Sequence, residues 1–413
     1  DYGIILKKLN YKELYISIKY LIKNPKKRRI LQINGFKNVK HITKINSNEI
    51  DNIRERLISD FKINYIKNKL RILNIYNLGQ KLNHRLYNIS LGKKFTNGFI
   101  RNEHDVLEIS DRDFIKQNRV FGFKKVQDKF QEYLIETFKN YNPNFLFFGH
   151  TNNINLETFD TLKNINKNLI ISQWNEDPIM PSLKDSKLNI DKILKYKNYT
   201  DHTFITTDPS VFNRHDRSLK NIHFCFIPVD KNIESYEVYK LNPRNDLFYA
   251  MSHGVNRATL KKGKSDNRIH FLNNLIKLMN NVNHDFYGFE NKEPVWGNEF
   301  YKALVNSKMG LNLSRGLPTK YYSSNRIASI TGNGLLTFID KKTELNKFFS
   351  NQEMVFYSNI HDLADKISFY KRNDKLRKKI AYNGKKRYFK LFNEKRITKY
   401  IIDCSVGKKT NLV

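Results

Sequence analysis

From residue 70 onward, short apolar runs alternate with amphipathic segments, and this alternation limits the fold more than any other feature of the chain. Such alternation predicts a parallel β-sheet with helices on both faces. Pro228 interrupts the pattern, which begins again at Asp246, so we predict two doubly wound, Rossmann-like halves with a boundary near 232–244. The expected strands are 71–76, one within 102–109, 145–148, 169–171, 203–205, 223–227, 246–251, 284–287, 309–313, 335–339 and 354–357.

Length and composition are consistent with two domains. The chain has 413 residues, of which 39% are hydrophobic and 13% aromatic, enough to build two cores. No apolar run reaches the roughly 18 residues of a membrane-spanning helix, and no charged segment followed by an apolar one indicates a secretory signal. Cys225 and Cys404 are too few for a disulfide framework or a metal cluster. We therefore expect a cytoplasmic protein.

The charge of the chain is strongly positive. Lys and Arg number 74 against 40 Asp and Glu, which gives a formal net charge of +34. A field of this sign favours anionic partners, of which nucleic acid, an anionic lipid surface and a phosphorylated substrate are the candidates. Enrichment in Lys, Asn and Ile is equally typical of a biased genome, in which case the charge carries no function. Composition alone leaves both interpretations open.

The sequence pattern of residues 1–68 predicts a separate extension that is basic and mainly helical. One apolar stripe recurs there at helical spacing and consists of Tyr11, Leu14, Tyr15, Ile18, Leu21 and Ile22. Asn24-Pro25 is expected to end this helix, and the basic run 26–29 follows it. A basic amphipathic helix can lie on an anionic membrane. Packing of the stripe on the rest of the protein is the alternative that we favour at this point.

The segment 309–340 carries the strongest functional pattern. It reads as a buried strand, a loop, a short helix within 323–330 that contains Arg326, a Gly332-Asn333-Gly334 break and a second buried strand. A helix N-terminus beside an arginine, at the carboxyl ends of strands, is suited to binding a diphosphate. The two glycines equally fit a tight turn between helix and strand.

This order resembles the donor half of the two-domain GT-B glycosyltransferases, specifically the bacterial "glycosyl transferases group 1" type related to spore-coat-maturation and surface-polysaccharide enzymes. The similarity spans about 70–400 and is firmest over 300–390, where 353–357, 362–363 and 380–384 also match the family pattern. The resemblance implies two Rossmann-like domains facing a cleft. The expected divisions are the extension 1–68, an acceptor domain 69–235, a nucleotide-sugar domain 240–385 and a C-terminal helix 386–413 that crosses back to the first domain.

The resemblance places a donor site in the second half. The candidates for it are Arg326, Arg315, Asn325, Arg257, Gly254, Gly332, Asn333 and Gly334. Arginines and close backbone approaches of this kind stabilise a leaving diphosphate without a metal. Many retaining enzymes of this fold use a glutamate on the donor helix to bind ribose, whereas Ser329 stands near that position here. The stereochemical course of the reaction is therefore left open.

The first half carries a polar cluster after its expected strand 169–171. Within 172–178, Trp174 and Asn175 are candidates for acceptor binding, and Glu176 or Asp177 for the base that takes the proton of an acceptor hydroxyl in an inverting reaction. His150, after the strand 145–148, is a further candidate base. A helix cap or turn at Asp177-Pro178 is the structural alternative.

We therefore expect a hexosyltransferase that moves a sugar from a nucleotide-sugar donor to a surface polysaccharide, lipopolysaccharide or other glycoconjugate. No cofactor and no metal are expected, because Asp111-Arg-Asp113 reads as a helix start rather than a metal motif. The expected partners are the nucleotide sugar, a glycan or lipid-linked acceptor, and an anionic membrane on its cytoplasmic face. A sugar-nucleotide epimerase on the same fold and a basic nucleic-acid-binding protein are the alternatives.

Overall fold

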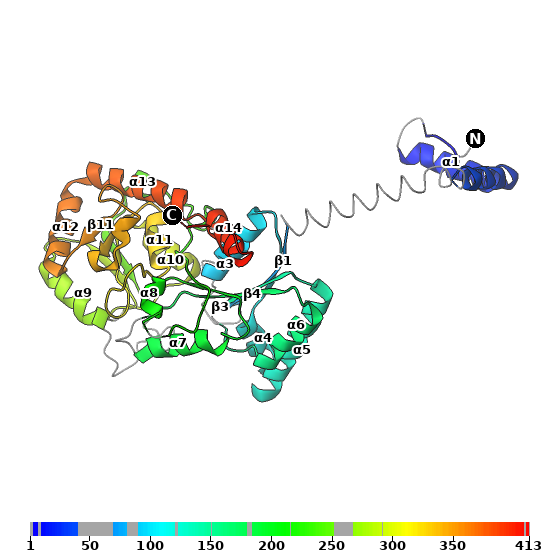
Figure 1. Cartoon of the computed structure of the whole chain (residues 1–413). Helices are drawn as coiled ribbons and strands as arrows, with labels where there is room; N and C mark the ends of the chain where they lie inside the picture. Colours follow the sequence, from blue (N-terminus) through cyan, green and yellow to red (C-terminus); the bar gives the residue numbers. More distant parts are fainter. Residues whose placement is uncertain are drawn as a thin grey trace. The chain divides into compact units, whose positions relative to one another are not determined.

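The computed structural model describes residues 3–6, 10–39, 69–80, 90–119, 123–149, 151–179, 184–214, 216–251, 267–290, 292–408 and 410–412. The chain separates into two compact units, Asp1–Lys69 and Leu70–Val413, which are considered separately below (Figure 1).

The described residues of the N-terminal unit form two helices. Helix α1 (Tyr11–Lys23) begins at Asn10, whose side chain accepts the backbone N–H of Glu13, and it ends at Asn24 as predicted. Pro25 then opens a second helix over 25–39, a position where its fixed φ and missing N–H cost nothing. No residue of α1 is buried.

The first half of the large unit is built on a six-stranded parallel sheet of order β2-β1-β3-β4-β5-β6. Its strands are β1 (Arg71–Ile75), β2 (Asp105–Ile109), β3 (Phe145–Gly149), β4 (Ile170–Asn175), β5 (His202–Ile205) and β6 (Ile222–Phe224). Its helices are α3 (Leu91–Arg101), α4 (Asp111–Gln117), α5 (Phe123–Tyr141), α6 (Leu156–Ile165), α7 (Lys184–Lys195) and α8 (Pro209–Phe212). The start of α4 at Asp111 confirms the predicted helix start.

The second half is built on a five-stranded parallel sheet of order β11-β10-β9-β7-β8. Its strands are β7 (Asn245–Ala250), β8 (His284–Tyr287), β9 (Ser307–Asn312), β10 (Leu336–Asp340) and β11 (Val355–Tyr357). Its helices are α9 (Asn267–Leu278), α10 (Gly297–Val305), α11 (Arg326–Gly332), α12 (Ile360–Arg372) and α13 (Asp374–Leu391), with 3-10 turns η2 (Val238–Lys240), η3 (Lys341–Thr343) and η4 (Leu345–Lys347). In each sheet the strand order reverses beside the first strand, β1 or β7, and ligands of open α/β sheets bind at such points.

Helices cover both faces of each sheet. On one face of the first sheet, Ile72 and Phe147 pack with α3 and with Ile397 of the last helix, α14 (Glu394–Ser405). On the other face, Leu73 and Phe148 pack with α5 and α6. This alternation follows the two-residue period of a strand. In the second sheet, α9 and α12 cover one face, and α10 covers the other.

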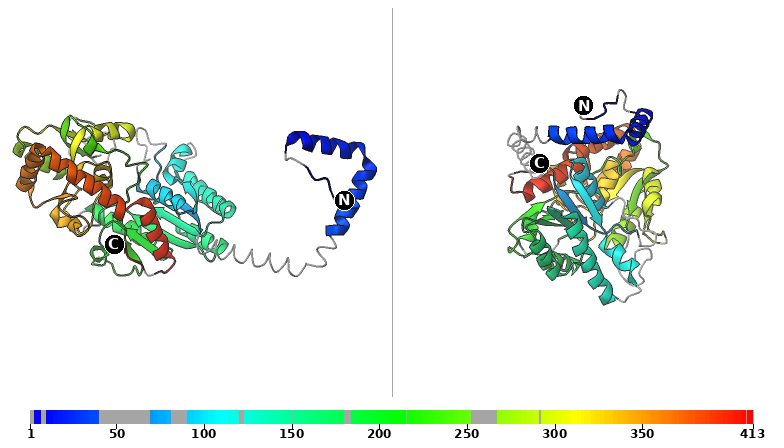
Figure 2. Two further views of the ribbon diagram at one scale, coloured as in Figure 1. Left: turned by 90° about the horizontal axis from the view of Figure 1, so that it is seen from above. Right: turned by 90° about the vertical axis from the view of Figure 1, so that its right-hand side faces the viewer.

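The two halves share part of their core, because the cluster that contains Ile72 also contains Ile327 of α11 and Tyr388 of α13. After α13 the chain returns to the first half, where α14 packs on α3 (Figure 2). Gly98 of α3 permits this contact, since a Cβ there would lie 2.3 Å from the carbonyl oxygen of Glu394. The expected boundary at 385 lies inside α13, which continues to Leu391, so the crossover begins later than we expected.

Two strand predictions need correction. β4 does not end at Ile171 but continues to Asn175, so 172–175 belong to the strand and not to a loop. β6 ends at Phe224, and the apolar residues 225–227 lie beyond it.

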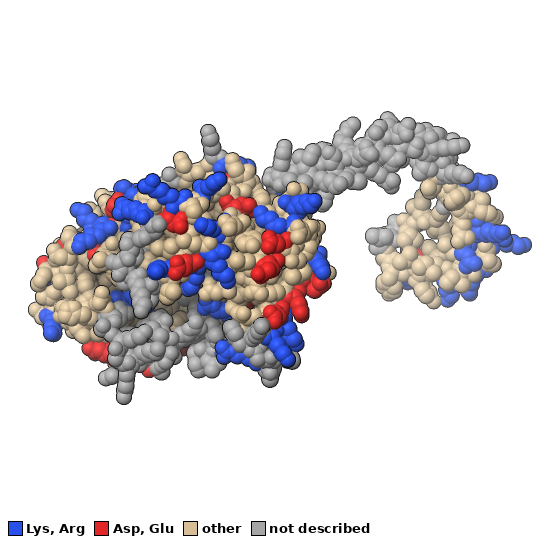
Figure 3. All heavy atoms as spheres, turned by 60° about the horizontal axis from the view of Figure 1, so that its bottom comes forward, with Lys and Arg blue, Asp and Glu red and all other residues tan. Residues whose placement is uncertain are grey.

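On the face of the large unit seen in Figure 3, Lys and Arg side chains are interspersed with Asp and Glu.

Candidate active site

Glu176 and Asp177 directly follow β4, at the carboxyl edge of the first sheet. The backbone N–H of Asp177 donates to Oδ1 of Asn175 at 3.0 Å, which makes a tight turn. Thr206, just after β5, donates its hydroxyl to the carbonyl oxygen of Glu176 at 3.1 Å. Both carboxylates are half-buried. The expected turn at Asp177-Pro178 is therefore present, and it holds the two carboxylates at the edge where ligands of such sheets bind.

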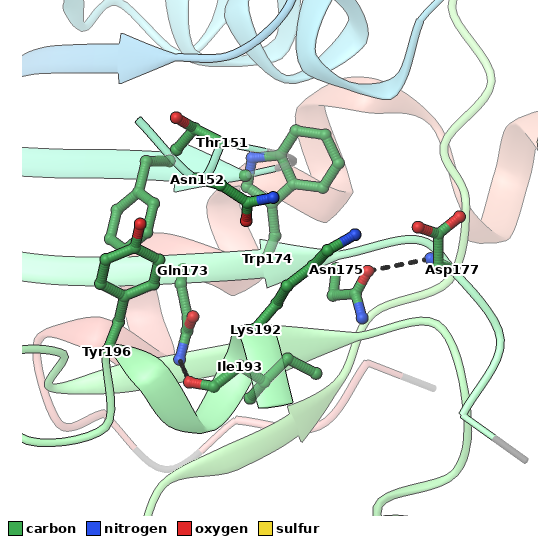
Figure 4. A pocket seen from close by; sticks show the side chains of 11 residues that line it. Thr151, Asn152, Gln173, Trp174, Asn175, Asp177, Lys192, Ile193 and Tyr196 are labelled. Atoms are coloured by element: carbon green, nitrogen blue, oxygen red, sulfur yellow. Dashed lines mark hydrogen bonds between the residues drawn. The ribbon is translucent and has the colours of Figure 1, made fainter. Parts of the chain in front are cut away.

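A pocket lies beside this turn, lined from β3, β4 and α7 (Figure 4). Asp177 and Tyr196 are at opposite ends of it in this view, and the Lys192 side chain reaches toward Asn175. The polar residues that line the pocket are Thr151, Asn152, Gln173, Asn175, Asp177, Lys192 and Tyr196. A lining of amides, hydroxyls, an amine and a carboxylate is suited to a ligand with many hydroxyl groups.

Trp174 contributes to this pocket from a buried position. Only 6% of the residue is exposed, and its ring packs edge-on against Phe95 with the centroids 5.4 Å apart. Gly149 lies against the indole, since a Cβ there would be 2.2 Å from ring atoms. With so little of the residue exposed, Trp174 offers no open face on which a sugar could stack. The indole is a core side chain whose surface closes one wall of the pocket.

Arg326 opens α11 and joins two strand ends of the second half. Its Nε donates to the carbonyl oxygen of Ala250 at the end of β7, and one terminal nitrogen donates to that of Leu313 after β9, both at 2.9 Å. The guanidinium also lies over the ring of Tyr249, 4.7 Å from its centroid. These contacts fix a half-buried cation at the point where the strand order of the second sheet reverses. Helix α11 has only seven residues, so Arg326 rather than the helix dipole supplies the positive charge.

The loop between β9 and α11, residues 313–325, lies against the first half. Lys320 pairs with Asp208 at 2.8 Å, and Tyr321 packs against Phe224 with ring centroids 5.3 Å apart. Arg315, a donor-site candidate, belongs to this loop and is half-buried. The loop thus connects the carboxyl edges of the two sheets.

Tyr322, in the same loop, lies where charged groups of both halves meet. Burial raises the pKa of its hydroxyl, the carboxylates Asp177 and Glu176 raise that pKa further, and Arg326 and Arg268 act in the opposite direction. All four charged side chains are therefore close enough to act electrostatically on one phenol. Arg268 stands near the start of α9, with 8% of its surface exposed. Carboxylates of the first half and arginines of the second half thus act on one buried side chain.

A buried ion pair reinforces this junction. Lys94 of α3 is fully buried, and its Nζ lies 2.6 Å from Oε1 of Glu234, in the segment between the two sheets. The same ammonium donates to Oδ1 of Asn325 at 3.1 Å, the residue before Arg326. Burial raises the pKa of the Glu234 carboxyl, although Lys94 acts in the opposite direction. Asn325 therefore binds the first half, and its side chain does not cap α11.

Gly332, Asn333 and Gly334 lie at the opposite end of α11 from Arg326, and not beside it as expected. They follow or end α11 and precede β10, so they lie at the amino edge of the second sheet. A Cβ on Gly332 would lie 2.6 Å from Glu234, and Gly334 has φ of +80°. Asn333 is fully buried and accepts the backbone N–H of Tyr236. The three residues form the helix-to-strand turn that was the alternative.

Three candidates, His150, Gly254 and Arg257, lie outside the described residues. Ser329, near the position of the family's ribose-binding glutamate, is buried inside α11 and offers no carboxylate. Within the described ranges, no group of three or more His, Cys, Asp or Glu side chains is arranged to hold a metal ion. In the same ranges, no helix is long and apolar enough to cross a bilayer.

Comparisons with known proteins agree with the fold. Residues 265–403 match the family model described as "Glycosyl transferase-like". The chain has the GT-B fold, and its second half carries a glycosyl transferase-like domain. The match covers β8 to β11 and α9 to α14, and therefore includes Arg268, Tyr322 and Arg326. No curated protein matches the sequence significantly.

Solved structures of GT-B proteins share the fold of this chain at low sequence identity. An alpha-glucosyltransferase in complex with UDP and a 13-mer DNA has a TM-score of 0.56 and 13% identity over 82% of this chain and 100% of that chain. HepE from Anabaena, in complex with UDP and glucose, has a TM-score of 0.53 and 11% identity over 82% and 100% of the chains. Sucrose-phosphate synthase from Thermosynechococcus elongatus has a TM-score of 0.54 and 10% identity over 81% and 97%.

Sequence reasoning missed three residues of this junction. Lys94 had a signal, because it stands on the apolar face of α3 between Leu91 and Phe95, where a charge is costly unless it is paired. Arg268 gave no signal beyond its place near the start of a helix. Tyr322 had no signal, since its importance depends on groups contributed by β4, α9 and α11.

Proposed function

We propose that this protein is a glycosyltransferase that moves a sugar from a nucleoside diphosphate sugar to a hydroxyl group of a glycan acceptor, without a metal ion. The observation that carries the proposal is the convergence at Tyr322. Arg326 and Arg268 from the second half act on the same phenol as Asp177 and Glu176 from the first half. Cations that stabilise a leaving diphosphate and a carboxylate that accepts a proton are the two parts that such a transfer needs.

The donor is assigned to the second half. Arg326 is oriented by carbonyl oxygens at the ends of β7 and β9, so its charge is held in place before a ligand binds. Preorganised charge of this kind favours a developing diphosphate because little reorganisation is needed. Asn325 and Arg315 complete the candidate set among the described residues. UDP-sugars are the first donors to test, because the solved structures of an alpha-glucosyltransferase and of HepE contain UDP.

The acceptor is assigned to the pocket of the first half. Asp177 lies at the end of that pocket and also acts electrostatically on Tyr322, as Arg326 does. An acceptor bound in the pocket would therefore have the Asp177 carboxylate at the end that is nearer the proposed donor site. In an inverting reaction this carboxylate takes the proton of the attacking hydroxyl. Asn152, Asn175 and Lys192 supply hydrogen bonds for other hydroxyls. A surface polysaccharide, a lipopolysaccharide or another glycoconjugate, reached from the cytoplasmic side, is the acceptor class we propose.

Product analysis tests the reaction. The full chain is incubated in the presence of a chelator with each of UDP-, GDP-, CDP- and dTDP-linked sugars, and with mono- and oligosaccharide acceptors. We expect a glycoside and free nucleoside diphosphate from one donor class, only when an acceptor is present. Conversion of the donor to an isomeric nucleotide sugar without acceptor would instead identify an epimerase. A strict requirement for added divalent metal would overturn the metal-independent part of the proposal.

A further inference from the structure

Within the N-terminal unit, taken by itself, an apolar stripe is left uncovered. The stripe on α1 predicted from the sequence is helical along its whole length, and α1 has no buried residue. Tyr11 is 86% exposed, Ile22 65% and Tyr15 60%. Leu14 and Ile18 are also exposed. Within the unit, no residue of the second helix covers the stripe well enough to bury it. A continuous apolar surface of this kind marks a docking site.

Positive charge lies along one edge of the stripe and in the segment that follows α1. Between residues 10 and 39 the only acidic residue is Glu13, and the basic residues are Lys12, Lys19, Lys23, Lys26, Lys27, Arg28, Arg29 and Lys37. At about 100° per residue, Lys12, Lys19 and Lys23 follow one edge of the apolar stripe. In Figure 3 the blue side chains of this unit lie beside a broad tan surface, with very little red.

We propose that the helices of residues 10–39 dock on an anionic lipid membrane. Exposed tyrosines and branched aliphatic residues would enter the boundary between headgroups and acyl chains, while lysines along the stripe edge stay at the level of the phosphates. A nucleic acid would satisfy the charge but would leave the apolar stripe in water. A neutral membrane would bury the stripe but leave the charge unmatched. The combination of both features selects the anionic lipid surface.

The proposal does not depend on the chemistry of glycosyl transfer. Residues 10–39 contain none of the groups assigned to the donor or the acceptor, so changes there leave the reaction with a soluble acceptor intact. Docking would instead raise the rate on acceptors that are themselves held in a membrane, by confining enzyme and acceptor to one surface.

Vesicle flotation with the full chain tests the docking. Vesicles of phosphatidylcholine alone are compared with vesicles that also contain phosphatidylglycerol. We expect binding to the anionic vesicles only, and a lower bound fraction as salt rises. Absence of the full chain from the floated anionic vesicles would overturn the proposal. Binding that a polyanionic RNA competitor removes completely, at a concentration that leaves the vesicles intact, would point to a purely electrostatic surface and would also overturn it.

A matched pair of variants separates docking of the stripe from attraction by charge alone. Ile18→Lys places a charge in the apolar stripe, and Ser17→Lys places the same charge on the next residue, outside the stripe. We expect Ile18→Lys to weaken partitioning into anionic vesicles about tenfold, since an apolar side chain is lost from the lipid. Ser17→Lys should bind at least as well as the wild type. Binding by Ile18→Lys that is as tight as that of the wild type, or tighter, would contradict the proposal. Attraction by charge alone predicts such a result, because the added lysine raises the net charge.

Discussion

Asp177 is held in a defined position before any substrate binds. Its backbone N–H donates to Asn175, and the neighbouring carbonyl of Glu176 accepts the Thr206 hydroxyl. The carboxylate can therefore be changed to an amide of nearly the same shape without disturbing the turn. This makes Asp177→Asn a suitable probe of the proposed base.

We predict that Asp177→Asn lowers kcat about 10²- to 10⁴-fold, the usual contribution of a general base, and leaves donor affinity within about twofold because donor phosphates are assigned to the other half. Steady-state kinetics and donor titration check both values. Asp191→Asn, on the exposed surface of α7, is the control and should keep wild-type rates. Full activity of Asp177→Asn would remove this residue as the base, and Glu176→Gln in the same assay shows whether its neighbour has that role.

The Lys94–Glu234 pair gives a prediction about stability and pH. Removing one partner of a buried ion pair strands the other charge, so Lys94→Met should lower the free energy of unfolding by about 3–5 kcal/mol at neutral pH. Burial already raises the pKa of Glu234 above its ordinary value, and loss of the ammonium raises that pKa further.

The sign of the pH dependence follows from linkage. A carboxyl whose folded-state pKa is raised binds its proton more tightly in the native state, so the folded protein gains stability as pH falls and loses it as pH rises through the folded pKa. The difference in Tm between wild type and Lys94→Met should therefore be smaller at pH 5 than at pH 7.5. Glu234→Gln in the Lys94→Met background should recover part of the loss at pH 7.5. A pH-independent difference would show that Glu234 is not the stranded group.

At the scale of elements, the contact between α3 and α14 holds the C-terminal crossover on the first half. Asn102 donates to the carbonyl oxygen of Lys395 at 2.7 Å and to Oγ1 of Thr398 at 2.9 Å. Arg101 pairs with Glu394 and with Asp230 of the segment between the sheets. Gly98 lies between these contacts, and a Cβ on it would be 2.3 Å from backbone.

We predict that Gly98→Ala destabilises the large unit by about 1–3 kcal/mol, the usual cost of overpacking, although alanine is the better helix former. Chemical denaturation measures this change. Ile100→Ala on the exposed side of the same helix should change stability far less, since Ile100 is 52% exposed. A Gly98→Ala protein as stable as the wild type would mean that α14 shifts away from α3 at little cost.

Elements differed in how well the sequence predicted them. The strands of both halves were predictable because buried parallel strands are short apolar runs. The end of β4 was not, because Ser172 and Gln173 are polar yet buried within the sheet, where Gln173 donates to the carbonyl oxygen of Ile193 and to Thr203. The Gly332–Gly334 turn was assigned to the wrong edge of the sheet, because a helix-to-strand turn and a ligand loop have the same glycine pattern.

At the scale of the whole molecule, the candidate site is assembled from distant parts of the chain. The sequence marks Asp177 and Arg326 as candidates and gives no sign of Arg268. Only the fold brings all three residues close enough to act on Tyr322. Sequence reasoning therefore predicted the carboxylates and Arg326 separately, by their positions after strands. It had no means to predict that these groups act on Tyr322, or that the Lys94 side chain of α3 donates a hydrogen bond to Asn325.

The net charge of +34 also belongs to this scale. On the large unit, basic residues are mixed with acidic ones on the face in Figure 3, whereas residues 10–39 combine eight basic residues with one acidic residue. The charge of residues 10–39 is thus strongly one-sided, and an apolar stripe accompanies it.

Calorimetric titration of the full chain with UDP-, GDP-, CDP- and dTDP-linked sugars, in the presence of a chelator, is the most direct test that a nucleotide sugar binds beside Arg326. We predict saturable binding of one donor class. It also predicts that Arg326→Ala weakens this binding about ten- to a hundredfold, the scale of a lost charge-assisted hydrogen bond. Lys302→Ala, which removes an exposed ion pair with Glu299 on α10, should leave the affinity unchanged. Equal donor affinity in folded Arg326→Ala and wild-type protein, or no binding of any nucleotide sugar, would contradict the assignment of the donor to this site.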